Sequence, residues 1–149
     1  MEVCEIEMTG ASDFDRVLGD WHDAHHAFMK GDPEPVKAIW SHAEDVSVAN
    51  PFGGAVRGWN EVGAAVDRSV TTVGDGDVGE FEVVSKHVGT DPAYVVEIEH
   101  FSFNRGGGQE TVQFSLRATM IFRPEAGTWR LVHRHADRNV TRETSNDAG

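Results

Sequence analysis

The sequence predicts one α+β domain in which N-terminal helices cover the apolar face of a bent antiparallel sheet. Its 149 residues are enough for a single domain with a core of its own. Apolar residues recur at helical spacing in the first half of the chain and at alternate positions in the second half. Short turns rich in Gly and Pro separate the alternating runs, which is typical of a meander of hairpins.

The first half of the chain predicts three helices. Ser12 or Asp13 can cap the first helix, which we expect to begin near Phe14. Its apolar face consists of Phe14, Val17, Leu18, Trp21, His25 and Phe28. Pro35 opens a short second helix and Gly58 precedes a third. We expect residues 1–11 and 138–149 to be flexible termini of a domain that spans residues 12–137.

Four strands are expected in the second half of the chain, near residues 80–88, 93–104, 110–123 and 128–136. A shorter strand near residues 45–49 precedes an Asn-Pro-Phe-Gly-Gly turn. Runs of this length accumulate twist, so the sheet should bend around the helices and leave a cavity at one end. One sheet face is strongly apolar, and the helices must therefore cover it.

Alternation along the strands predicts which side chains share a face. The side that carries Leu116 and Met120 should face the helices. A second set, on the opposite side, comprises Glu97, Glu99, Arg117 and Thr119. In the last strand, alternation from a shared apolar side predicts that the following residues point inward: Trp129, Leu131, His133, His135 and Asp137.

Charge and composition exclude several classes of function. The formal net charge of −12 opposes general binding to nucleic acid, whose phosphates would be repelled. The chain has neither a secretory signal nor an apolar run long enough to span a membrane. A single cysteine, Cys4, cannot form an internal disulfide, which favours the cytoplasm. We therefore expect a cytoplasmic protein with no nucleic-acid or membrane partner.

Three local pieces of sequence carry a resemblance to a known family. They are Val96-Glu97-Ile98-Glu99-His100, Leu116-Arg117-Ala118-Thr119 and the segment from Trp129 to Asp137. With the order of the elements, they resemble the SnoaL-like branch of the nuclear-transport-factor and ketosteroid-isomerase superfamily. The resemblance implies a cone-shaped, barrel-like fold with a pocket at its open end, usually in a homodimer. Because this fold serves isomerases, cyclases, hydrolases and binding domains, it implies no particular reaction.

His133, His135 and Arg117 are the candidate catalytic residues. Two histidines and Asp137 on one strand face can bind a divalent metal, move a proton or simply fill the core. We expect no metal, and expect a histidine to act as an acid or base. Arg117 can orient a substrate oxygen, or form a cross-strand ion pair with Glu99 on the outer face. A β-bulge in either strand would reverse this assignment of faces.

Further residues are expected to line the pocket and bind a ligand. These are Trp21, His25, Trp40, Asn50, Phe52, Trp59, Glu99, Thr119 and Asp137. His25 lies on the apolar stripe of the first helix, and burial there should lower the pKa of its imidazole. His22 and His26 are expected on a solvated helix face. Asn50 stands where related enzymes often place an acid, which weakens the resemblance to a ketosteroid isomerase.

Two functions remain open from the sequence. The first is a cofactor-independent isomerase, cyclase or hydrolase that uses acid–base chemistry on a small hydrophobic molecule. The alternative is a non-catalytic domain for ligand binding, dimerisation or assembly. In both cases we expect a homodimer that forms through the exposed face of the sheet.

Overall fold

The computed structural model describes residues 2–51, 53–73, 75–104 and 110–140. The described chain contains three helices, α1 (Glu2–Met29), α2 (Glu34–Ile39) and α3 (Trp59–Val73). Its strands are β1 (Ser47–Ala49), β2 (Ala55–Arg57), β3 (Gly76–Val88), β4 (Ala93–Asn104), β5 (Thr111–Glu125) and β6 (Thr128–Arg138). Phe52 and residues 141–149 of the expected flexible terminus 138–149 lie outside the described residues, whereas Arg138 ends β6.

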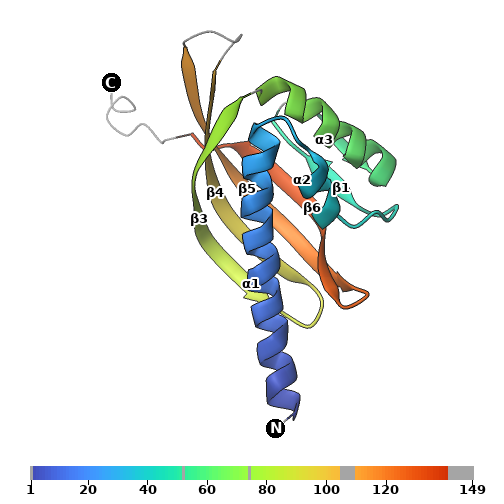
Figure 1. Cartoon of the computed structure of the whole chain (residues 1–149). Helices are drawn as coiled ribbons and strands as arrows, with labels where there is room; N and C mark the ends of the chain where they lie inside the picture. Colours follow the sequence, from blue (N-terminus) through green and yellow to red (C-terminus); the bar gives the residue numbers. More distant parts are fainter. Residues whose placement is uncertain (1, 52, 74, 105–109, 141–149) are drawn as a thin grey trace, which may run out of the picture.

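The six strands form one curved sheet in the order β2-β1-β6-β5-β4-β3. Strands β3 to β6 are the expected antiparallel meander, while β1 pairs with β6 in parallel, so the sheet is mixed. Helix α1 lies along the concave side of the sheet, and α2 and α3 lie beside its upper part (Figure 1). The predicted fold class, helices within a strongly curved sheet, is confirmed.

Helix α1 is longer than the apolar pattern indicates. It begins at Glu2 rather than near Phe14. From Phe14 onward the predicted apolar stripe faces the core: Phe14 and Trp21 are 0% and 1% exposed, and Val17 and Phe28 are partly buried.

The core fills the space between α1 and the sheet. The inward residues of β5 behave as alternation predicts, since Ala118, Met120 and Phe122 are all buried. Phe14 packs edge-to-face against Phe122, with ring centroids 5.1 Å apart. Burial of large aromatic and aliphatic side chains on both layers is the main force that holds α1 on the sheet.

The expected facing of β6 is wrong after Leu131, because a β-bulge interrupts its pairing with β5. Phe122 pairs with Leu131, but the preceding residue, Ile121, pairs with His133, so Val132 is an extra residue. An extra residue reverses which side chains point inward. Beyond the bulge, Arg134 and Ala136 therefore point toward the helices, and the intervening residues point outward.

The expected facing of Glu97 and Glu99 is also wrong. In the β4–β5 pairing, Glu97 stands opposite Ala118 and Glu99 opposite Leu116. Directly opposed residues share a sheet face, and both of these partners are buried. The two glutamates accordingly lie within the core, each with 0% exposure, and not on the side of Arg117.

Candidate functional site

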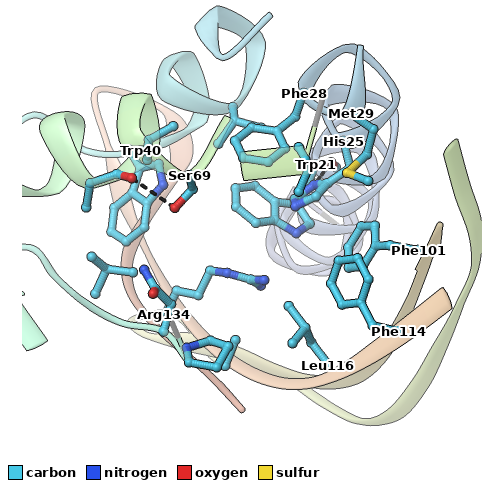
Figure 2. Close-up of a pocket in the computed structure, with 18 residues that line it drawn as sticks. Trp21, His25, Phe28, Met29, Trp40, Ser69, Phe101, Phe114, Leu116 and Arg134 are labelled. Carbon is cyan, nitrogen blue, oxygen red and sulfur yellow. Dashed lines mark hydrogen bonds between the residues drawn. The ribbon is translucent and has the colours of Figure 1, made fainter. Parts of the chain in front are cut away.

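A cavity of about 100 Å³ lies between α1, α3 and the concave face of the sheet. Its wall is predominantly apolar and aromatic (Figure 2). Polar contributions come from His25, Asn50, Ser69 and Arg134. An apolar cavity with a few convergent polar groups is the usual form of a small-molecule site.

Helix α1 supplies one side of this wall because of its residue spacing. Trp21, His25 and Phe28 follow one another at intervals of four and three residues, which places them on one helix face. The His25 ring lies 4.5 Å from the Trp21 ring and 5.8 Å from that of Phe101 on β4. Phe101 in turn stacks on Phe114 at 5.2 Å, so aromatic rings continue from the helix onto the sheet.

His25 is neutral at physiological pH. Burial lowers the pKa of His25 to about 4, although the nearby Glu99 carboxylate raises it in part. Its Nδ1 lies 3.0 Å from the backbone carbonyl oxygen of Trp21. A carbonyl only accepts hydrogen bonds, so Nδ1 carries the proton and Nε2 is the free base of the ring. The structure confirms the predicted burial of His25 and the direction of its pKa shift.

Arg134 is the cation of the cavity, and its side chain extends from β6 into the open space below Trp21 (Figure 2). It donates two hydrogen bonds to Glu99, of 2.6 Å and 2.9 Å. The guanidinium also lies 5.4 Å from the Trp21 ring centroid, in cation–π distance. Burial alone lowers the pKa of Arg134, but Glu99 outweighs this effect and raises it. Arg134 is therefore a permanently charged group that its partner neutralises.

Behind this pair lies a second buried carboxyl group, that of Glu97. His22 Nε2 lies 2.7 Å from Glu97 Oε1, and the His22 ring stacks on Phe81 at 4.0 Å. Glu97 Oε2 has no hydrogen-bond donor among the described residues. Burial is the main reason that the pKa of Glu97 is raised, to about 7. His22 is thus part of a buried polar network rather than of a solvated helix face, while His26 is exposed as expected.

Four of the expected ligand-binding residues line the cavity: Trp21, His25, Trp40 and Asn50. Two others lie elsewhere. Trp59 stacks on His42 with ring centroids 4.0 Å apart, and Glu99 stands behind Arg134 rather than at the cavity surface. Phe52 is outside the described residues, so its expected role is untested.

The remaining expected residues lie on the outer side of the sheet, away from this cavity: His133, His135, Arg117, Thr119 and Asp137. The bulge at Val132 is the reason that the side chains of the two histidines and Asp137 point outward. His133 Nδ1 is 2.8 Å from Ser47 Oγ, and His135 pairs with Asp137 at 3.4 Å. The expectation that these imidazoles face the hollow is wrong.

Sequence reasoning missed Arg134, the most informative residue of the site. Simple alternation places it on the outer side, and no residue type at Val132 signals the bulge. Its partner Glu99 could have been found from alternation within β4, where Val95, Glu97, Glu99 and Phe101 share one face. The apolar neighbours of Glu97 and Glu99 then indicate two carboxyl groups in the core.

One group of described side chains could hold a metal ion. Glu80, Glu82 and His100 bring three ligand atoms within 4.8 Å of one another on the outer side of β3 and β4. In the structure, His100 is hydrogen-bonded instead to Glu82 and Ser115, each at 2.6 Å. This group does not line the cavity.

Comparison with known proteins places the chain in a family. The model of the SnoaL-like domain matches residues 13–137. The chain belongs to the SnoaL-like family. No curated protein matches this SnoaL-like chain in sequence. None of the helices that the structure describes has the length and apolar character needed to cross a membrane.

Solved structures show the same fold at low sequence identity. A nuclear transport factor 2-like protein from Salmonella enterica is 16% identical, with a TM-score of 0.74 over 93% of this SnoaL-like chain and 97% of its own. A candidate dehydratase of the NTF2-like family from Streptomyces avermitilis is 19% identical, with a TM-score of 0.71 over 89% and 98%. A ketosteroid isomerase-like protein from Erwinia carotovora atroseptica is 16% identical, with a TM-score of 0.70 over 87% and 96%.

Proposed function

We propose that this SnoaL-like protein binds a small, mostly apolar molecule that contains one ring and an oxygen acceptor. The observation that carries the proposal is the guanidinium of Arg134, which projects into an otherwise aromatic cavity (Figure 2). A buried arginine is expensive to desolvate, and a cavity that served only as packing would not need one. The ring of the ligand would lie among Trp21, Phe28 and Phe101, with its oxygen toward Arg134.

The hydrogen bonds of Arg134 leave room for such an oxygen. A guanidinium carries five N–H groups. Among the described residues, Glu99 accepts from two of them and the Met120 sulfur, at 3.5 Å, from a third. The Trp21 Nε1–H in the same wall is buried and also has no acceptor among the described residues. Unused donors in an apolar wall favour a ligand that brings acceptors.

The size of the cavity limits the ligand. Its volume of about 100 Å³ is of the same order as the ~150 Å³ of an apolar protein cavity that holds benzene. One six-membered ring with a short polar substituent is therefore the expected scale. A steroid or other fused-ring molecule would require the wall to open.

Titration with single-ring compounds tests the proposal, with ¹⁵N-labelled protein and acetophenone, benzamide and benzoate as probes. At least one probe should shift the resonances of cavity residues, including the Trp21 indole. An Ala65→Leu variant fills the cavity wall and should abolish binding, whereas Ala64→Leu, on the same helix but outside the wall, should not. Shifts confined to the outer side of the sheet would refute the proposal.

His25 favours a second candidate function, proton transfer on a carbonyl compound without a cofactor. The base Nε2 of His25 belongs to the same cavity wall as Arg134, which could stabilise a developing oxyanion. The similarity to a candidate dehydratase and to a ketosteroid isomerase-like protein supports this possibility. Exchange of the methyl protons of acetophenone for deuterium, followed by NMR, tests it. His25→Asn should remove any such exchange and retain binding.

We also propose that the protein is a cytoplasmic homodimer. The exposed sheet face offers apolar side chains for such a contact, since Val84 and Tyr94 are 65% and 39% exposed. Sedimentation velocity should give twice the monomer mass, and Val84→Lys should reduce it. A monomer at all concentrations would refute the dimer.

A further inference from the structure

Two carboxyl groups are buried in the core beside a single arginine, Arg134. Glu99 holds Arg134 through both of its oxygens, at 2.6 Å and 2.9 Å. Glu97, two residues earlier on the same side of β4, is also fully buried, and the hydrogen-bond donor for it among the described residues is His22, at 2.7 Å. Its Oε2 has no donor among the described residues. A buried carboxylate oxygen without a donor is unfavourable, so this atom calls for a proton of its own.

The surroundings of Glu97 show where that proton would go. From α1, it faces His22; from β4 it faces Glu99; from β6 it faces Arg134, while His25 on α1 faces Glu99 instead. The residues opposite Glu97 on β3 and β5 are Val83 and Ala118, which are uncharged. A protonated Glu97 can donate to the Glu99 carboxylate, which satisfies both groups.

We propose that Glu97 holds a proton up to about neutral pH and donates it to Glu99, and that loss of this proton at higher pH weakens the binding of a carboxylate ligand at Arg134. The second part of this inference rests on the proposed function. With Glu97 neutral, the Glu99–Arg134 pair is balanced and a ligand carboxylate adds one negative charge. With Glu97 ionised, that ligand enters a cavity with an additional negative charge behind Arg134. An uncharged ligand of the same shape is not subject to this repulsion.

The electrostatics of the pair agree with this arrangement. Burial and the neighbouring Glu99 raise the pKa of Glu97, against the opposite effect of the His22 hydrogen bond. Burial also raises the pKa of Glu99, but Arg134 outweighs burial and lowers it overall. Two carboxyl groups in contact therefore separate into one acid and one carboxylate. His22 is 23% exposed and connects Glu97 with solvent.

The first test follows the proton in the unliganded protein. ¹³C NMR of glutamate carboxyl carbons should show one buried group that ionises near pH 7, and the Glu97→Gln variant should lack this signal. Glu80→Gln, which removes an exposed carboxyl group from β3, is the matched control and should retain it. If Glu97 is already ionised at pH 6, the inference is overturned.

The second test measures how benzoate and its uncharged analogue benzamide bind between pH 6 and pH 8.5. If only the protein with protonated Glu97 accepts benzoate, the affinity for benzoate should fall by up to about 30-fold from pH 6 to pH 8.5, given a Glu97 pKa of about 7. Benzamide affinity should change less than twofold. In Glu97→Gln, whose amide imitates the protonated acid, benzoate affinity should be independent of pH.

The outcomes of the two tests are distinct. A wild-type benzoate affinity that does not vary with pH, or a Glu97→Gln variant that varies as steeply as the wild type, overturns the inference. So does a His22→Gln variant that loses the pH dependence while Glu97 still titrates near pH 7, because His22 would then be the responsible group. If neither compound binds at any pH, the proposed function and the ligand part of the inference fail. The NMR titration alone then decides whether Glu97 holds a proton.

Discussion

Removal of the negative charge of Glu99 should destabilise the protein strongly. Glu99→Gln keeps the shape of the side chain but leaves the Arg134 guanidinium without a counter-charge. Glu99 is 0% and Arg134 11% exposed at the side chain, so water cannot replace the lost partner. Arginine cannot escape by losing its proton. Breaking a buried pair in this way costs about 3–5 kcal/mol.

For a chain of this length, that loss corresponds to a decrease in Tm of roughly 6–20 °C. Urea and thermal unfolding followed by circular dichroism at pH 6 will measure it, since Glu97 should remain neutral there. Asp45→Asn is the matched control, because Asp45 also pairs with an arginine at 2.6 Å but is 53% exposed. We expect this exposed pair to contribute far less than the Glu99–Arg134 pair, because solvent screens it.

A double variant tests whether the loss of stability comes from the unpaired charge of Arg134. Glu99→Leu with Arg134→Met replaces the ion pair by apolar side chains of similar size, and such replacements are often neutral. The double variant should therefore be more stable than Glu99→Gln, by at least 2 kcal/mol or so. If Glu99→Gln loses less than 1 kcal/mol, or if the double variant is the least stable of all, the pair is not the buried, self-neutralised unit described above.

Three further predictions concern other parts of the structure. Below pH 6.5 His25 is protonated in the unfolded chain but not in the native protein, so the free energy of unfolding should fall by about 3 kcal/mol as the pH drops to 4. Urea unfolding at each pH measures this loss, and the His25→Asn variant should lack it. Gly76→Ala should destabilise the protein by about 1–3 kcal/mol, because the new Cβ would lie 2.6 Å from the Ser102 backbone oxygen. Gly54→Ala is the control, since a Cβ there meets open space. Chemical denaturation compares the two variants, and equal stability would contradict the close packing at Gly76. His135→Ala should change stability by less than about 0.5 kcal/mol and leave the affinity for benzamide unchanged. A tenfold loss of affinity would indicate that the ligand binds at the outer histidines and not in the cavity.

Local patterns predicted the fold well. Helical spacing found the buried stripe of α1 from Phe14 onward, and the position of His25 on that stripe predicted both its burial and its lowered pKa. Strict alternation in β5 predicted the inward side of the sheet. These features depend on neighbours within one element, and the sequence displays such neighbours directly.

The site was harder to predict because it depends on register. A single extra residue at Val132 exchanged the facing of Arg134 with that of His133 and His135. Nothing in the residue types near Val132 requires a bulge, since the packing of β6 between β1 and β5 determines where it forms. The burial of Glu97 and Glu99 is likewise a consequence of cross-strand pairing, which opposes them to Ala118 and Leu116.

The most direct test of the central claim, that Arg134 presents an aromatic cavity to an oxygen-bearing ring, is a crystal structure of the protein soaked with 4-bromobenzoate. Anomalous scattering locates the bromine independently of the phases of the protein. We expect the bromine among the rings of Trp21, Phe28 and Phe101, with the carboxylate within hydrogen-bond distance of Arg134. Bromine only on the outer side of the sheet, with the cavity lacking the compound at saturating concentration, would contradict it.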